Sequence, residues 1–154
     1  HRLEYVGEIN GVRFINDSKA TNVDSVKYAL SSFEGRCLVW ILGGVDKGND
    51  YQLLATEVAA HVKTIVALGK DNSKILSFYS RTFSSKPDTK SMTEAVEAAF
   101  NLSENGDVVL LSPACASFDL FRNYEDRGEQ FKAAVQQLQL KLMSNHKPHI
   151  HAAS

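Results

Sequence analysis

Three continuously apolar runs of strand length constrain the fold of this chain more than any other feature. A strand covered on one face alternates apolar and polar residues, whereas a continuous run is typical of a strand buried on both faces. Amphipathic segments of helical length separate the runs, and strands that alternate with helices favour a parallel sheet. The sequence therefore predicts an α/β fold with a doubly wound, mostly parallel sheet and helices on both faces. The three runs are Cys37–Gly44, Lys63–Gly69 and Asp107–Ser112.

A β-hairpin is predicted ahead of this sheet. The strand-like segments Leu3–Ile9 and Val12–Asp17 flank the dipeptide Asn10-Gly11. These two residue types tolerate the positive φ angles of a type I′ turn, which joins antiparallel strands.

Helices are predicted where apolar residues recur at a spacing of three or four positions. Thr21 or Asn22 can cap the first helix, and Ser91 or Thr93 can cap a later one, because their side chains accept from free backbone N–H groups. The predicted helical ranges are 21–33, 51–62, 73–80, 91–106 and 124–143, with a weak strand or loop over 81–90.

The length of 154 residues suffices for one domain with a substantial core. We predict a single domain over residues 1–138 and a flexible tail over 139–154, because helical periodicity fades near Lys141. The histidine-containing segment 146–151 is interpreted as an unstructured extension rather than a metal site. Since the chain begins at His1 on a strand-like pattern, without a methionine, we expect it to be a piece of a longer protein.

The charge and hydropathy patterns argue against several classes of partner. A formal net charge of −1 gives no electrostatic reason to expect nucleic acid or an anionic membrane. No apolar stretch approaches the roughly 20 residues that span a bilayer, so membrane insertion is not expected. Cys37 and Cys115 lie beside apolar runs, which favours reduced thiols in a cytoplasmic protein over a disulfide framework.

The loops that follow the strands are the place to look for function. In open α/β sheets, ligands bind beyond the carboxyl ends of the strands. Small residues, hydroxyl groups and lysines are frequent in these loops, which we expect to share one edge of the sheet. They are Asn16–Asn22 (NDSKATN), Gly43–Asp50 (GGVDKGND), Gly69–Ser73 (GKDNS) and Ser112–Asp119 (SPACASFD).

Two lysines in these loops indicate an anion site. Gly43 and Gly44 permit a tight turn close to a ligand, and Lys47 adds a cation. The segment does not match a phosphate-binding loop, and alone it is equally consistent with an ordinary strand-to-helix turn. Lys19 stands before a predicted helix start, where free N–H groups attract anions. Asp17 could accept from sugar hydroxyls, although a local pair with Lys19 is the simpler interpretation.

The small residues of Ser112–Asp119 leave room for a ligand to reach the backbone. We interpret Cys115 as a small buried thiol rather than a nucleophile, because no histidine lies near it in sequence. Neither Ser112 nor Ser117 lies in the G-x-S-x-G turn of a serine hydrolase. Together the loops favour a site for a small polyanion, such as a dicarboxylate or a nucleotide.

Four segments, taken in order, resemble the C-terminal domain of the Mur ligases, and most resemble the members that add D-glutamate. Each segment alone is a weak signal, but the ordered set is specific, and the similarity extends from His1 to about Leu138. The resemblance implies a Rossmann-like fold, in agreement with the strand pattern. The segments are His1–Glu4, Asn16–Asn22, Gly43–Gly48 and Leu111–Phe131.

The resemblance implies an ATP-dependent amide ligase of cytoplasmic peptidoglycan synthesis. In that family, ATP phosphorylates the alanyl carboxylate of UDP-N-acetylmuramoyl-L-alanine. The amine of D-glutamate then attacks the acyl phosphate, and the tetrahedral intermediate collapses to the amide and phosphate. The protein contributes positioning and charge stabilisation.

The resemblance also implies a seat for D-glutamate. Lys47 and Thr21 match ligands of its α-carboxylate. Ser117, with the backbone around Phe118 and Tyr124, matches the seat of its side-chain carboxylate. The small residues before Ser117 would then let that carboxylate reach backbone amides.

Further implied roles concern ATP. Lys19 is expected near the glutamate and the reacting phosphoryl group, as the catalytic residue of this domain. Asp17 and Arg2 match positions that hold the ATP ribose and phosphates. The phosphate-binding loop and most Mg²⁺ ligands of the family belong to a central domain, and UDP recognition belongs to an N-terminal domain. Both are missing from this chain, so we expect an inactive, monomeric fragment with no metal ligand of its own.

Two alternatives stay open from the sequence alone. A related Mur ligase with another acceptor, or a ligase similar to folylpolyglutamate synthase, would use the same fold and lysines with a different acceptor pocket. A domain that binds a nucleotide or an amino acid without catalysis would also explain the loops.

Overall fold

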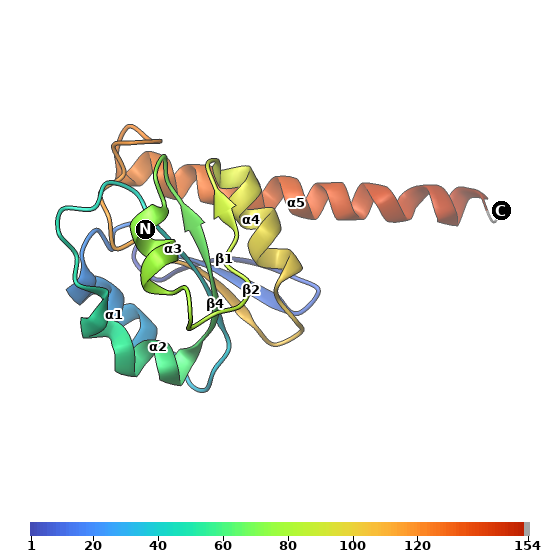
Figure 1. Ribbon diagram of the computed structural model, residues 1–154. Helices are drawn as coiled ribbons and strands as arrows, with labels where there is room; N and C mark the ends of the chain where they lie inside the picture. The colour runs from blue at the N-terminus through green and yellow to red at the C-terminus, as the bar shows by residue number, and fades with distance from the viewer. Residues whose placement is uncertain (153–154) are drawn as a thin grey trace.

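The computed structural model describes the backbone of residues 1–152 and the side chains of residues 1–145 (Figure 1). Its centre is one six-stranded sheet in the order β1-β2-β6-β3-β4-β5. Strand β1 pairs antiparallel with β2, and the remaining neighbours pair parallel. The predicted doubly wound α/β sheet with an N-terminal hairpin is therefore confirmed. The strands are β1 (Glu4–Ile9), β2 (Val12–Asn16), β3 (Leu38–Leu42), β4 (Val62–Leu68), β5 (Asp88–Thr89) and β6 (Val108–Leu111).

Five α-helices and one 3₁₀ turn accompany the strands within the described residues, and α5 follows the last strand. The Asn22 side chain accepts from the Ser25 backbone N–H at 2.9 Å and so caps the first helix. The range 51–62, predicted as one helix, divides into a 3₁₀ turn and a short α-helix, and Val62 already belongs to β4. The helices are α1 (Val23–Ser31), η1 (Tyr51–Leu54), α2 (Ala55–His61), α3 (Ser73–Phe78), α4 (Met92–Asn101) and α5 (Tyr124–Ala152).

The central strands β3 and β6 are buried on both faces, which explains why they are continuously apolar. Leu38, Trp40 and Leu42 of β3 pack in the cluster that contains α1, α2 and α3. Val39 and Ile41 point the other way and pack with α4 and α5. Figure 1 shows α1 and α2 side by side on one face, with α4 and α5 on the other.

The hairpin turn has the geometry that its dipeptide predicts. Asn10 and Gly11 adopt φ angles of 50° and 78°, as a type I′ turn requires at both central positions. The turn directs β2 into the sheet beside β6, so the end of β2 lies next to the end of β6.

Helix α5 is longer than the range 124–143 predicted from the sequence. Its backbone is helical as far as Ala152, and Figure 1 shows this last part projecting from the body. The division of the chain at residue 138 stays a prediction. The side chains of the histidine-containing segment 146–151, and residues 153–154 entirely, lie outside the described residues.

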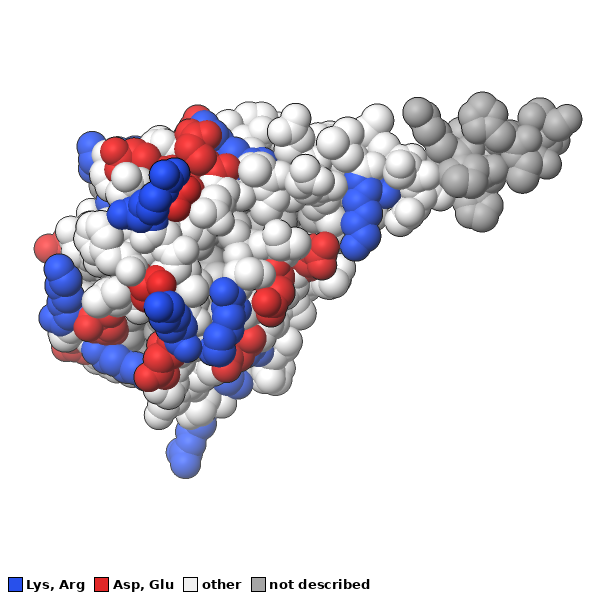
Figure 2. Space-filling view, turned by 90° about the horizontal axis from the view of Figure 1, so that it is seen from above, with Lys and Arg blue, Asp and Glu red and all other residues white. Residues whose placement is uncertain are grey.

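Charged side chains of both signs are interspersed on the face of the body that Figure 2 shows. The mixture accords with the net charge of −1. Among the described helices, none combines the length and the apolar character that crossing a bilayer requires.

Candidate functional site

The carboxyl end of β6 lies between the carboxyl ends of β2 and β3. Helix α5, which follows β6, covers one face, whereas α1 and α2, which follow the neighbouring strands β2 and β3, cover the other. The chain thus leaves adjacent strands in opposite directions, and ligands of open α/β sheets bind at such a switch point.

Backbone hydrogen bonds join the loop after β6 to the loop after β2. The Asp17 N–H donates to the Leu111 carbonyl at 2.8 Å, and the Ala114 N–H donates to the Ala20 carbonyl at 2.9 Å. Asn16–Asn22 and Ser112–Asp119 therefore lie side by side, as the sequence predicted for loops at one edge.

The loops after β3 and β4 are joined to the same loop. Val45 and Ala116 exchange backbone hydrogen bonds of 2.9 and 3.1 Å. The Lys70 N–H donates to the Asp119 carboxylate at 3.0 Å. All four loops that the sequence selected thus meet at one edge.

Glycines make the close contact between these loops possible. Gly43 and Gly44 adopt φ angles of +136° and +133°, which side chains disfavour. A Cβ on Gly44 would lie 2.3 Å from the Ala116 carbonyl oxygen, and one on Gly43 would lie equally close to the Leu68 carbonyl oxygen. Only glycine lets the loop after β3 pass between its neighbours.

We expect Gly44→Ala to lower the free energy of unfolding by more than about 2 kcal/mol, through backbone strain and forced separation of the loops. Urea denaturation of the variant measures this loss. The matched control is Gly48→Ala, because Gly48 also has a positive φ (+97°) but has open space around its Cβ position. Its loss should be about 1 kcal/mol. Equal losses in both variants would show that crowding against Ala116 contributes nothing.

The predicted lysines are exposed on the joined loops. Lys19, Thr21 and Lys47 are all exposed, and Thr21 directly precedes Asn22, the residue that caps α1. The ion pairs among the described side chains include neither Lys19 nor Lys47. Both ammonium groups can therefore meet an anion without first breaking a pair.

The residues predicted to hold the second carboxylate differ in exposure. Ser117 is 2% exposed and Phe118 is 68% exposed, although they are adjacent. Tyr124 opens α5, and its carbonyl accepts from the Ser18 hydroxyl at 2.6 Å. The structure brings these three residues to the same edge as the lysines, and their roles stay predictions.

The Asp17 carboxylate already accepts hydrogen bonds from within the domain. Its carboxylate is 3% exposed and accepts from the Ser112 hydroxyl at 2.8 Å and the Leu3 N–H at 3.2 Å. Burial raises its pKa, although these two donors and the nearby Arg2 act in the opposite direction. Each oxygen keeps a second lone pair, so contact of Asp17 with a ribose hydroxyl stays a prediction, as does contact of the exposed Arg2 with phosphate.

Arg127 is a residue of this edge that the sequence analysis did not select. Its guanidinium is 1% exposed and donates to the Ser18 hydroxyl at 2.9 Å, the Ser18 carbonyl at 2.7 Å and the Cys115 carbonyl at 2.9 Å. Burial lowers the pKa of Arg127 to about 10, so it stays charged at neutral pH. It joins α5 to the loops after β2 and β6.

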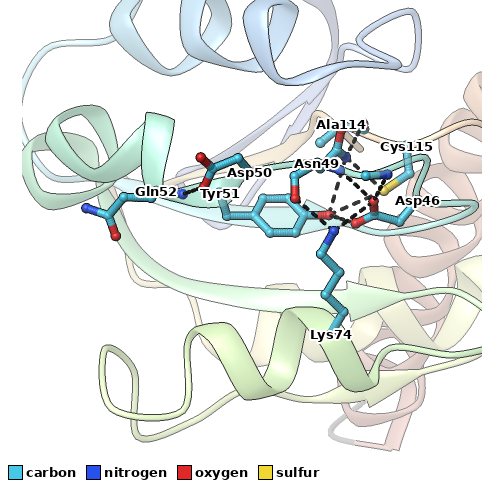
Figure 3. Close-up of polar contacts among 9 residues, drawn as sticks. Asp46, Asn49, Asp50, Tyr51, Gln52, Lys74, Ala114 and Cys115 are labelled. Atoms are coloured by element: carbon cyan, nitrogen blue, oxygen red, sulfur yellow. Dashed lines mark hydrogen bonds and ion pairs between the residues drawn. The ribbon is translucent and has the colours of Figure 1, made fainter.

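A second unselected group lies beneath the Lys47 loop, and Figure 3 shows it. The Tyr51 hydroxyl and the Lys74 ammonium converge on Asp46 at 2.9 and 3.0 Å. Cys115 lies beside them, 3.5 Å from the Tyr51 hydroxyl. Burial raises the pKa of Cys115, which agrees with a packed thiol. No local pattern in the sequence predicts this group, because its members come from separate loops and helices.

Comparisons with known proteins identify the family of this chain. The family model described as "Mur ligase, glutamate ligase domain" matches residues 1–115. The UDP-N-acetylmuramoylalanine--D-glutamate ligase of Cytophaga hutchinsonii is 59% identical over 138 residues, which cover 90% of this chain and 30% of that protein. The protein of the same name from Christiangramia forsetii is also 59% identical over 138 residues, 90% of this chain and 31% of that protein.

A third relative of that name, from Porphyromonas gingivalis, is 53% identical over 135 residues, 88% of this chain and 30% of that protein. The chain therefore spans about a third of the length of these curated relatives. The resemblance seen in the ordered loop motifs is confirmed by a match to most of the chain. The chain belongs to the Mur ligase family, within its glutamate ligase domain.

Proposed function

We propose that this domain binds the acceptor amino acid of an ATP-dependent ligase that joins D-glutamate to UDP-N-acetylmuramoyl-L-alanine in cytoplasmic peptidoglycan synthesis. The observation that carries the proposal is the meeting of the loops with Lys19, Lys47 and Ser117 at one edge of the sheet. Relatives that are 50–59% identical to this chain are named UDP-N-acetylmuramoylalanine--D-glutamate ligase, and this name supports the two proposed substrates.

D-Glutamate carries two carboxylates, and the edge offers two seats for them. Lys47 and Thr21 bind the α-carboxylate from the loops after β3 and β2. Ser117, with backbone N–H groups near Phe118 and Tyr124, binds the side-chain carboxylate. Two separated seats favour a ligand with two anionic groups because each seat alone gives only part of the binding energy.

The reaction proceeds through an acyl phosphate. The γ-phosphoryl group of ATP passes to the alanyl carboxylate, which gives the acyl phosphate and ADP. The amine of D-glutamate attacks the acyl carbon and loses a proton, and the intermediate expels phosphate to leave the amide. The Lys19 ammonium stabilises negative charge on the reacting phosphoryl group, while Arg2 and Asp17 contact ATP.

Mg²⁺ would be expected with ATP, and the family resemblance implies that most of its ligands lie outside this chain. Among the side chains that the structure describes, no group of three or more His, Cys, Asp or Glu is arranged to hold a metal ion. We derive no step through a metal held by this domain.

The proposal is tested by turnover with ATP, UDP-N-acetylmuramoyl-L-alanine and D-glutamate. The protein that contains this domain together with the remaining two-thirds found in its relatives should form product. The chain of 154 residues alone should form none, because most of the relatives' length is outside it. Product from this chain alone would contradict the assignment of ATP activation to the other domains.

The choice of acceptor is tested separately. In calorimetric titrations of the longer protein, we expect binding heat from D-glutamate and from no other amino acid at the same concentration. Preference for a different amino acid would keep the ligase chemistry and reject the D-glutamate seat.

A further inference from the structure

The backbone around Lys47 is held by the side chain that precedes it. Asp46 Oδ1 accepts from the backbone N–H groups of Gly48 and Asn49, each at 2.8 Å. Lys47 thus lies inside a turn that the Asp46 carboxylate closes, as aspartate side chains do in tight turns. The direction of the Lys47 side chain therefore depends on the position of the Asp46 carboxylate.

Two elements outside the loop fix the carboxylate. Lys74 of α3 lies 3.0 Å from Asp46 Oδ1, and its ammonium also donates to the Asn49 carbonyl at 2.8 Å. The buried Tyr51 of η1 donates its hydroxyl to Asp46 Oδ2 at 2.9 Å. Burial alone would raise the pKa of Asp46, but the donors of Asn49, Lys74 and Gly48 outweigh it and hold the pKa below its ordinary value.

The loop that contains Lys47 (Gly43–Asp50) also forms hydrogen bonds with the loop that contains Ser117 (Ser112–Asp119), on both sides of Lys47. The Val45–Ala116 backbone pair lies before Lys47. The Asn49 side-chain amide donates to the Ala114 carbonyl at 2.8 Å after it. Two contacts, one on each side of Lys47, therefore set the separation between Lys47 and Ser117. The second contact depends on the position of Asn49, whose backbone carbonyl also accepts from Lys74 (Figure 3).

We infer that Asp46, Tyr51 and Lys74 are positioning residues that set the distance between the two carboxylate seats at Lys47 and Ser117. The inference rests on the proposed function, in which both seats bind one D-glutamate. A fixed separation suits a dicarboxylic amino acid of one chain length, so the cluster contributes to selection of D-glutamate over the shorter D-aspartate. None of the three residues is assigned a contact with the reacting atoms.

The experiment compares Lys74→Met, Lys74→Arg and Lys63→Met in the full-length protein. Lys63→Met is the matched control, because Lys63 pairs with Asp107 at 2.6 Å where β4 and β6 begin, at the opposite edge of the sheet. Lys74→Met should raise KM for D-glutamate about tenfold, the effect of losing charge-assisted hydrogen bonds, and leave kcat and KM for ATP within about twofold. The preference for D-glutamate over D-aspartate should fall, and Lys74→Arg should restore most of both values.

Hydrogen exchange gives a readout that does not need turnover. The Gly48 and Asn49 amides should exchange faster in Lys74→Met than in the wild type and remain unchanged in Lys63→Met. Unchanged exchange together with unchanged KM would overturn the inference while leaving the ligase function intact. An equal rise of KM in Lys63→Met would overturn it too, by showing a general loss of stability. A wild-type protein that never uses D-glutamate would reject the proposed function instead.

Discussion

Under the proposed function, replacement of Lys47 by alanine in the full-length protein should raise KM for D-glutamate by a factor of about 30 or more, which corresponds to the loss of about 2–5 kcal/mol on removing one partner of a charge pair. The loss is large because, in the proposed function, the α-carboxylate would stay bound without its cation. KM for the UDP-linked substrate should change little, since no contact with it is assigned to Lys47. Initial-rate kinetics with each substrate varied in turn measure both constants.

The control for Lys47→Ala is Lys70→Ala. Lys70 is also exposed and lies on the loop after β4, at the same edge of the sheet. Its removal lowers the local positive charge equally, but it has no predicted contact with D-glutamate. If KM for D-glutamate rises equally in both variants, the lysines attract D-glutamate through the overall positive electrostatic potential of this edge and not through a specific contact. If it stays unchanged in Lys47→Ala, Lys47 is a solvated surface lysine.

The strands and the edge were predictable because both follow from short-range patterns. Leu38–Leu42 is apolar at every position, which is typical of a strand covered on both faces. Parallel strands end at a common edge, so the loops with Lys19, Lys47 and Ser117 had to meet there once the alternation of strands and helices was recognised.

The side-chain contacts that hold these loops in place were not predictable, because they join distant parts of the chain. Lys74 reaches Asp46 across 28 positions, and Arg127 reaches Ser18 across 109. Such pairs depend on how far each helix advances along the sheet, which no local pattern specifies. The boundary at Val62 was missed for a related reason, since its pairing with Leu38 in β3 decides where β4 begins.

We expect Arg127→Met to lower the free energy of unfolding by about 2–4 kcal/mol. Methionine fills much of the arginine's volume but donates no hydrogen bond, so the buried carbonyls of Ser18 and Cys115 lose their donors. Removing a buried charge offsets part of this loss, because burial disfavours the charged guanidinium. We expect the hydrogen bonds to dominate, since the guanidinium bonds through all three of its nitrogens.

Urea denaturation measures the change, with Arg122→Met as the control. The Arg122 side chain is 87% exposed just before α5, so its replacement should change stability by less than about 0.5 kcal/mol. Arg127→Lys tests the geometry of the guanidinium, because one ammonium cannot reproduce its planar fork of donors to Ser18 and Cys115. Stability equal to that of the wild type in Arg127→Lys would show that charge alone joins α5 to the edge, whereas a loss close to that of Arg127→Met identifies the fork itself as the link.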